Sequence, residues 1–193
     1  MQKLWQKKLK LNYSDDVVDI VQFGSSILEE SKPNDMDIAI IFKTISVKEQ
    51  IKEAHNIKKQ IEKLTELPVQ IESFDLPRLF DKSNFAREGI LVYGKSLLNG
   101  KNFSEKFGII PRLRISYVLR DLEKKDKVRF NYLLNGKGGN YGLLKKYGGK
   151  IIYPGVVETF PENENLFVNK MKNIVQRINV ERCFISSFEE IKS

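Results

Sequence analysis

The chain of 193 residues has one cysteine, one histidine and no long apolar run. A single cysteine, Cys183, excludes an internal disulfide framework and fits a reducing compartment, so we expect a cytoplasmic protein. The one histidine, His55, lies far from Cys183 in the sequence, which gives no basis for a thiol nucleophile. No apolar run approaches the ~18 residues of a membrane span, and the basic first ten residues lack the apolar core of a signal peptide. We therefore expect no membrane partner.

The composition is that of a globular protein with an uneven charge. Hydrophobic residues make up 41% of the chain and charged residues 30%, which is ordinary, and the length suits one large domain or two small ones. The net charge of +8 has its excess in one stretch, because residues 111–150 contain eleven Lys or Arg and three Asp or Glu. Such a run is usually a solvated face, but a basic surface also attracts nucleic acid.

Two aspartates one residue apart, Asp35 and Asp37, open an apolar run at residues 38–42. In a strand, residues i and i+2 point to the same face, so the two carboxylates are expected to lie side by side. Packing gains nothing from this arrangement, because like charges repel and raise one another's pKa. Divalent cations bound to phosphates need such oxygen ligands. The pair therefore predicts metal-assisted phosphoryl chemistry.

A glycine-serine step precedes the acidic pair, at the end of an apolar strand predicted at residues 20–23. Gly24 permits a tight turn and a close approach of the backbone to a ligand. Ser25 and Ser26 offer hydroxyls and amides at the start of a short helix expected at residues 26–30, where an anion can bind. A phosphate held there would lie beside a cation held by the aspartates.

With Gly24, Ser25, Asp35 and Asp37 in this order, the chain resembles the minimal nucleotidyltransferases of the DNA polymerase beta-type superfamily, over the first half of the sequence to about Gly94. The resemblance implies a two-metal transfer of a nucleoside monophosphate from a nucleoside triphosphate, with ATP as the first candidate, and with Mg²⁺ or Mn²⁺ as cofactor. It also implies that Asp35 and Asp37 hold the metal, and that Gly24, Ser25 and Ser26 bind the nucleotide. One departure is that residues 26–34 lack the arginine that many relatives carry.

The family's third acid is expected on a later strand, predicted at residues 67–74. Many relatives have it directly after a Pro-Val pair, where this chain has Gln70, a poor ligand without charge. Glu72 points to the same face as Gln70 and has a longer side chain than Asp, so we predict Glu72 as the third catalytic and metal-binding acid. If Gln70 occupies that position instead, activity is compromised.

The first half of the chain has an α/β order of elements. Ser46 and Glu49 form a capping-box pattern that opens a helix expected to run to about Leu67, before Pro68. Helices at residues 77–80 and 83–88 and a strand at residues 90–93, closed by Gly94, are expected to follow. The fold class is α/β to α+β, with a mixed sheet backed by helices over residues 1–97, a polar linker at 98–110, and a small basic α+β module at 111–193.

The basic module interleaves cations with aromatic residues, which is also the composition of a surface that follows a phosphate backbone and stacks bases. Arg112, Arg114 and Lys137 are the predicted nucleic-acid contacts. The glycine-rich segment 135–142 is expected as a turn rather than a phosphate cradle, because it follows a helix and lacks the Lys-Ser/Thr of a phosphate-binding loop. The elements expected beyond it are a short helix at 143–147, strands at 151–154, 156–160 and 180–186, and a helix from 161.

Three functions remain open at this point. The first is an active nucleotidyltransferase whose acceptor hydroxyl belongs to RNA, a protein side chain or a small molecule. The second is a nucleotidyltransferase fold without chemistry that binds nucleic acid through its basic half. The third is a non-enzymatic partner protein, such as the antitoxin of a two-component system. The residue at the third acidic position separates the first function from the other two.

Overall fold

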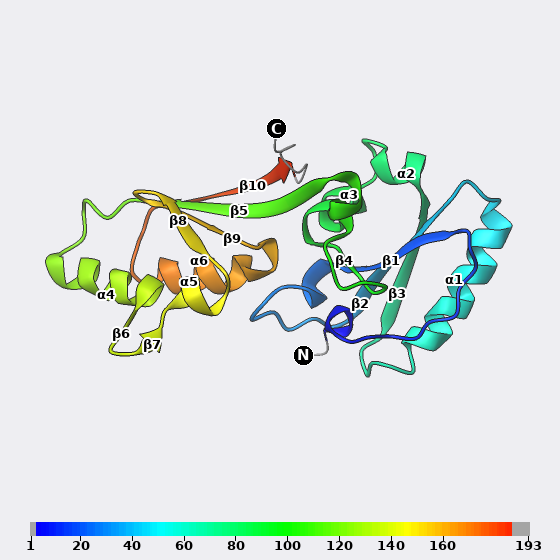
Figure 1. The fold of residues 1–193 in the computed structure, drawn as a ribbon, viewed down its shortest axis with the longest axis horizontal. Helices are drawn as coiled ribbons and strands as arrows, with labels where there is room; N and C mark the ends of the chain where they lie inside the picture. Colours follow the sequence, from blue (N-terminus) through cyan, green and yellow to red (C-terminus); the bar gives the residue numbers. More distant parts are fainter. Residues whose placement is uncertain (1–2, 187–193) are drawn as a thin grey trace, which may run out of the picture. The chain divides into compact units, whose positions relative to one another are not determined.

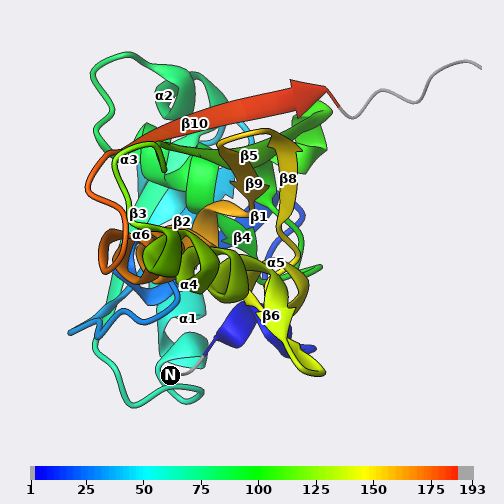
Figure 2. The same ribbon diagram turned by 90° about the vertical axis from the view of Figure 1, so that its left-hand side faces the viewer.

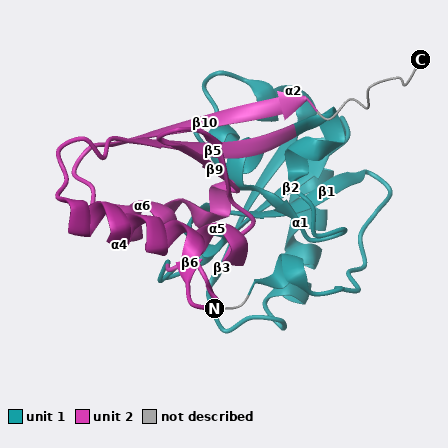
Figure 3. Cartoon of the chain, turned by 60° about the vertical axis from the view of Figure 1, so that its left-hand side comes forward, with its two compact units in different colours: residues 1–27, 31–109, 187–193 teal, residues 28–30, 110–186 magenta. Residues whose placement is uncertain are grey.

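The computed structural model describes residues 3–186, which divide into two compact units (Figure 3). Of these residues, unit 1 contains 3–27 and 31–109, and unit 2 contains 28–30 and 110–186. Each unit has its own sheet and its own buried apolar cluster. None of the helices within residues 3–186 has the length and apolar character needed to cross a membrane.

Unit 1 is built on a four-stranded sheet with the order β3-β2-β1-β4 (Figure 1). The strands are β1 (Val17–Phe23), β2 (Met36–Phe42), β3 (Val69–Asp75) and the short β4 (Lys95–Ser96). β2 pairs antiparallel with β1 and parallel with β3, and β4 joins the other edge of β1 antiparallel. The sheet is therefore mixed, as the sequence predicts.

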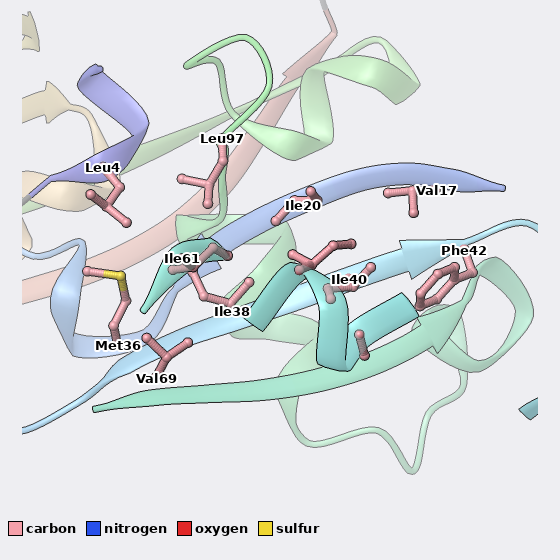
Figure 4. Close-up of a cluster of buried hydrophobic side chains, with 12 residues drawn as sticks. Leu4, Val17, Ile20, Met36, Ile38, Ile40, Phe42, Ile61, Val69 and Leu97 are labelled. Atoms are coloured by element: carbon pink, nitrogen blue, oxygen red, sulfur yellow. The ribbon is translucent and has the colours of Figure 1, made fainter. Parts of the chain in front are cut away.

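Helix α1 (Val47–Ile61) covers one face of this sheet and connects the two parallel strands. It buries Ala54, Ile57 and Ile61 against Ile38 and Ile40 of β2 (Figure 4). The capping box is confirmed, because the Ser46 hydroxyl accepts from the Glu49 amide at 3.3 Å while the Glu49 carboxylate accepts from the Ser46 amide at 3.1 Å. The helix ends at Ile61 rather than near Leu67, since Leu64, the next residue of the apolar stripe, is exposed.

Short helical turns cover the opposite face of the sheet. They are α2 (Leu76–Phe80), α3 (Ala86–Glu88) and a π-turn, η3 (Gly89–Tyr93). The expected strand at residues 90–93 is wrong: this apolar run is helical, with Ile90 and Val92 buried, and the Gly94 amide donates to the Ile90 carbonyl at 3.0 Å. The expected helix at residues 26–30 is also wrong, because only a 3₁₀ turn, η2 (Gly24–Ser26), forms there.

The segment expected as a linker, residues 98–110, packs into unit 1 for most of its length. It contains a 3₁₀ turn, η4 (Phe103–Phe107), in which Phe103 and Ser104 are fully buried. Lys106 of this turn reaches the buried carboxylate of Asp19 on β1, with 3.2 Å between Nζ and Oδ2. The polar composition of the segment therefore serves contacts inside unit 1.

Unit 2 has a four-stranded sheet with the order β10-β5-β9-β8 and three helices on one side of it (Figure 2). The strands are β5 (Ile109–Tyr117), β8 (Lys150–Tyr153), β9 (Val156–Thr159) and β10 (Ile178–Ser186). The helices are α4 (Lys124–Asn135), α5 (Leu143–Lys146) and α6 (Glu164–Lys172), and a 3₁₀ turn, η5 (Pro161–Asn163), directly precedes α6. Unit 1 also contains a 3₁₀ turn, η1 (Leu4–Gln6). The core forms where Leu113, Ile115 and Val157 meet Phe130 and Phe167.

The glycine-rich segment of unit 2 forms a hairpin of two short strands, β6 (Gly136–Lys137) and β7 (Asn140–Tyr141). Gly138 and Gly139 make its turn with φ of 59° and 87°, backbone angles that favour glycine. These glycines are thus explained by the turn, as expected, and no phosphate cradle is needed to account for them.

The capping box of α1 gives a first prediction. Ser46→Ala removes the hydroxyl that accepts from the Glu49 amide, so the free energy of unfolding should fall by about 1 kcal/mol. Lys48→Ala, in the same exposed turn, is the matched control and should leave it within ~0.5 kcal/mol. Urea unfolding of the three proteins measures the difference. Equal midpoints for Ser46→Ala and the control would contradict the role given to the cap.

Candidate functional site

Strand pairing fixes the position of the acidic pair at one end of the unit 1 sheet. Asp37 is the second residue of β2 and lies between Phe23 of β1 and Gln70 of β3. Its side chain is on the same face as Ala39 and Ile41, the face that α1 does not cover. Asp35 lies two residues earlier, just before the strand begins. The structure therefore places both carboxylates at the same end of the sheet.

Gly24 lies directly against Asp37. It follows β1 with φ of +71°, and a Cβ at this position would overlap the Asp37 carboxylate. Both its conformation and the available space thus call for glycine. Of the two serines, Ser25 is exposed, whereas Ser26 is 1% exposed and its hydroxyl donates to the Phe23 carbonyl and accepts from Gln22 Nε2, both at 3.1 Å. The Ser26 hydroxyl is thus engaged in the interior, and a contact of Ser26 with a nucleotide stays a prediction that rests on its backbone amide.

Two residues of β3, Gln70 and Glu72, are the candidates for the third acidic position, and both lie near the acidic pair. Gln70 is opposite Asp37 in the strand register, and its Nε2 donates to Asp35. Glu72 is opposite Ala39 on the same face, and it lines an open cleft together with Asp37. The structure thus gives Gln70 a contact with the acidic pair and places Glu72 next to Asp37 in the cleft.

The cleft itself has a volume of ≈ 540 Å³. Its walls are Phe23, Asp37 and Glu72 on the sheet side and residues 83–86 on the other side. Residues 83–85 belong to the connection between α2 and α3, Ala86 is the first residue of α3, and the sequence did not indicate any of them as part of a site. The one signal that was present is Phe85, an aromatic residue within a polar stretch that begins at Asp81.

The electrostatics of the cleft are unfavourable for a bare carboxylate. Burial raises the pKa of Asp37, and the charges of Asp35 and Glu72 raise it further. Across residues 3–186, neither Asp37 nor Glu72 has an ion pair or a side-chain hydrogen bond to offset this repulsion. An uncompensated group of acids in a cleft is what a divalent cation would neutralise.

The residues fit a cation in their chemistry, although the ligand set is not preassembled. In the described part of the chain, no three His, Cys, Asp or Glu side chains lie close enough together to form a metal site. Asp37 and Glu72 supply two unpaired carboxylates to one cleft, while Asp35 is turned toward Gln70. Asp35 would have to shift toward Asp37 and Glu72 to become a third ligand. Oxygen ligands of this kind suit Mg²⁺ or Mn²⁺.

The predicted nucleic-acid contacts of unit 2 have different surroundings. Arg112 and Arg114 extend from β5 toward Glu158 of β9, which is 4% exposed. The Arg114 Nε lies 3.1 Å and the Arg112 Nε 4.0 Å from the Glu158 carboxylate, and Lys150 Nζ lies 3.3 Å from it. Burial opposes the charge of Glu158, but hydrogen bonds and charges from Arg114 and Lys150 hold its pKa below the usual range. Both arginines are thus engaged inside unit 2.

The lysine of the hairpin is the exposed member of the predicted set. Lys137 lies over the Tyr132 ring at 4.9 Å, and Lys145 lies over the Tyr141 ring at 3.9 Å. All four side chains are exposed. The exposed cations of α4, the hairpin and α5 are Lys124, Lys125, Lys127, Arg129, Lys137, Lys145 and Lys146.

Comparison of the chain with protein-family models, with curated proteins and with solved structures found no match. What the protein does is therefore inferred from its own residues and from the site that they form.

The raised pKa of Asp37 predicts how stability depends on pH without metal. Below the unfolded-state pKa, Asp37 is protonated in both states and has no effect. As the pH rises, the unfolded state loses the proton first, so stability falls until the pH passes the folded-state pKa. In EDTA, Asp37→Asn should therefore melt at a higher temperature than the wild type at pH 7, and this advantage should vanish below about pH 3.

Asp15→Asn is the matched control for this prediction, because Asp15 is an exposed aspartate of the same unit. It should show no advantage at pH 7. An Asp37→Asn protein that is less stable than the wild type at pH 7 would mean that the carboxylate is stabilised by a partner.

The cluster of Arg112, Arg114 and Lys150 around Glu158 predicts that this carboxylate stabilises unit 2 in a pH-dependent way. Glu158→Gln leaves three cations without their carboxylate, so the free energy of unfolding at pH 7 should fall by about 1–3 kcal/mol. The loss should shrink in acid, because a carboxyl with a lowered pKa stabilises the fold only while it is ionised. Chemical unfolding at pH 7 and pH 3 measures both effects. Glu181→Gln, an exposed glutamate of β10, is the control, and an equal effect there would rule out a special role for Glu158.

Proposed function

We propose that unit 1 is a metal-dependent nucleotidyltransferase, which moves a nucleoside monophosphate from a nucleoside triphosphate to an acceptor hydroxyl, with ATP as the first candidate donor. The observation that carries this proposal is the pair of uncompensated carboxylates, Asp37 and Glu72, in one cleft beside the Gly24 turn. Repelling acids without a cation are costly for folding alone, and phosphoryl transfer is a reaction that uses them.

Each residue has a role in the proposed reaction. Asp37 and Glu72, with Asp35 after it shifts toward them, would hold Mg²⁺ or Mn²⁺. Such ions would neutralise charge on the phosphates and polarise the phosphoryl group. The amides of Gly24 and Ser25, beside the Asp37 carboxylate, are the proposed contacts of the triphosphate.

The chemistry is a substitution at the α-phosphorus. The acceptor oxygen forms a bond to this phosphorus, the bond from the phosphorus to the bridging oxygen breaks, and pyrophosphate leaves. A cleft carboxylate takes the proton of the acceptor hydroxyl. The acceptor is RNA, a protein side chain or a small molecule.

The second candidate function is a nucleotidyltransferase fold without chemistry that acts as a nucleic-acid-binding or antitoxin-like partner protein. The contact between the Gln70 amide and Asp35 favours it, because an amide occupies a place beside the acidic pair where a third acid would attract a cation. The two functions differ in whether position 70 or position 72 completes the metal site.

The test is transfer of label from each α-³²P-labelled nucleoside triphosphate, with Mg²⁺ or Mn²⁺, to total RNA or to lysate proteins and metabolites. Asp37→Asn and Glu72→Gln should each lower transfer by at least about 100-fold, since losing a metal ligand costs several kcal/mol of transition-state stabilisation. Asp15→Asn and Glu66→Gln, exposed acids of the same unit, are the matched controls and should keep full transfer.

Gln70→Glu separates the two functions. If Glu72 is the third ligand, an added acid beside Asp37 increases the repulsion and does not raise transfer. If wild-type transfer is absent and Gln70→Glu creates it, position 70 is the ligand position and the natural protein is a fold without chemistry. Full transfer by Asp37→Asn would reject the metal site altogether.

A further inference from the structure

Phe85 is the most exposed large apolar side chain in the described part of the chain. Its relative exposure is 101%, and the next highest value among such side chains is 66%, at Tyr153. A phenylalanine in this position contributes no burial to folding, although burial is what such a side chain usually contributes. The ring is therefore free of packing within unit 1 and available to contact a ligand.

The segment that carries Phe85 is held by hydrogen bonds on both sides of it. The Asp81 carboxylate accepts from the Ser83 amide at 2.8 Å and from the Ser83 hydroxyl at 2.6 Å. The Asn84 side chain donates to the carbonyls of Arg78 and Leu79 at 3.3 Å. Its Oδ1 accepts from the Ala86 amide at 3.0 Å.

These contacts restrain the neighbours of Phe85 and leave its ring outside. They also use the polar side chains of Ser83 and Asn84, so that the ring is the main unengaged group of this segment.

The same segment is a wall of the acidic cleft. Residues 83–86, Phe85 included, line it opposite Asp37 and Glu72. The residue that carries the exposed ring thus borders the same space of ≈ 540 Å³ as the two uncompensated carboxylates. A nucleoside triphosphate matches both features of the cleft. Its phosphates would bind a cation held by the two acids, and its base is a planar π-system that can stack on an aromatic ring.

We propose that Phe85 is the platform on which the base of the bound nucleoside triphosphate stacks. This inference rests on the proposed function of the cleft. Base stacking on an aromatic side chain is tolerant of sequence, since every base has a π-face. A protein partner fits the site less well, because the same cleft presents the uncompensated carboxylates of Asp37 and Glu72, and charged residues are depleted at the centre of protein interfaces.

The bonding of Ser83 and Asn84 has a consequence for specificity. The side chains of Ser83 and Asn84 already form hydrogen bonds within the segment, so they offer few donors or acceptors to the edge of a bound base. Discrimination should therefore follow stacking strength alone, with ATP and GTP bound somewhat more tightly than CTP and UTP.

The experiment compares Mg²⁺-ATP with Mg²⁺-triphosphate, the inorganic ion that lacks a base, by isothermal titration calorimetry of the full chain. Phe85→Ala should weaken ATP binding by about 5- to 150-fold, the range for removal of one base–aromatic stack, and should leave triphosphate binding unchanged. Phe85→Trp should bind ATP at least as tightly as the wild type. Its exposed indole should also be quenched by ATP and not by triphosphate.

Ile51→Ala is the matched control, since Ile51 is a 64% exposed apolar side chain on α1, which covers the other face of the sheet. It should change neither affinity. Ile51→Trp controls for the fluorescence measurement and should show no quenching by ATP.

Three results would overturn the inference, and they are distinguishable. If the wild type binds ATP more tightly than triphosphate, and Phe85→Ala keeps this preference undiminished, the base lies elsewhere and the proposed function stands. If Phe85→Ala weakens ATP and triphosphate equally, the residue positions the cleft and does not stack. If the wild type binds neither ligand, the stacking role fails together with the proposed nucleotidyltransferase.

Discussion

The position of β2 between β1 and β3 is the constraint on which the rest of unit 1 depends. Its residues are buried on both faces of the sheet, so a shift of one residue would exchange the two apolar clusters. The same shift would turn Asp37 toward α1 and away from the cleft. The core therefore fixes the register, and the register brings Phe23, Asp37 and Gln70 into one row. The site is positioned by apolar packing that includes none of its own acids.

The sequence predicts those parts of unit 1 that are encoded locally. Period-2 patterns and a capping box are local signals, and β1, β2, β3, the start of α1 and the shared face of Gln70 and Glu72 follow from them. The short β4 was not predicted. The run at residues 90–93 was predicted wrongly because a short apolar run suits a strand or a buried helical turn equally well. Whether this run forms a strand or a helical turn depends on tertiary packing, which a local sequence pattern does not contain.

The site is predictable only where its residues are close in sequence. Asp35, Asp37 and Gly24 stand near one another in the chain, and the structure places them together. The inward direction of the Ser26 hydroxyl and the wall formed by residues 83–86 depend on contacts across the fold. In unit 2, the partnership of Arg112 and Arg114 with Glu158 joins strands that are far apart in sequence. A count of cations could not distinguish such engaged arginines from the exposed lysines.

The parallel pairing of β2 with β3 bears on when the cleft comes into being during folding. β1 and β2 are neighbours in the chain and can pair early, but two strands alone are marginal in water. β3 can join only after the crossover through α1 has closed, and residues 83–86 follow β3. A nascent chain that ends before them can carry the acidic pair without any pocket around it. The cleft thus forms only after residues 83–86 have been synthesised and have packed against the sheet.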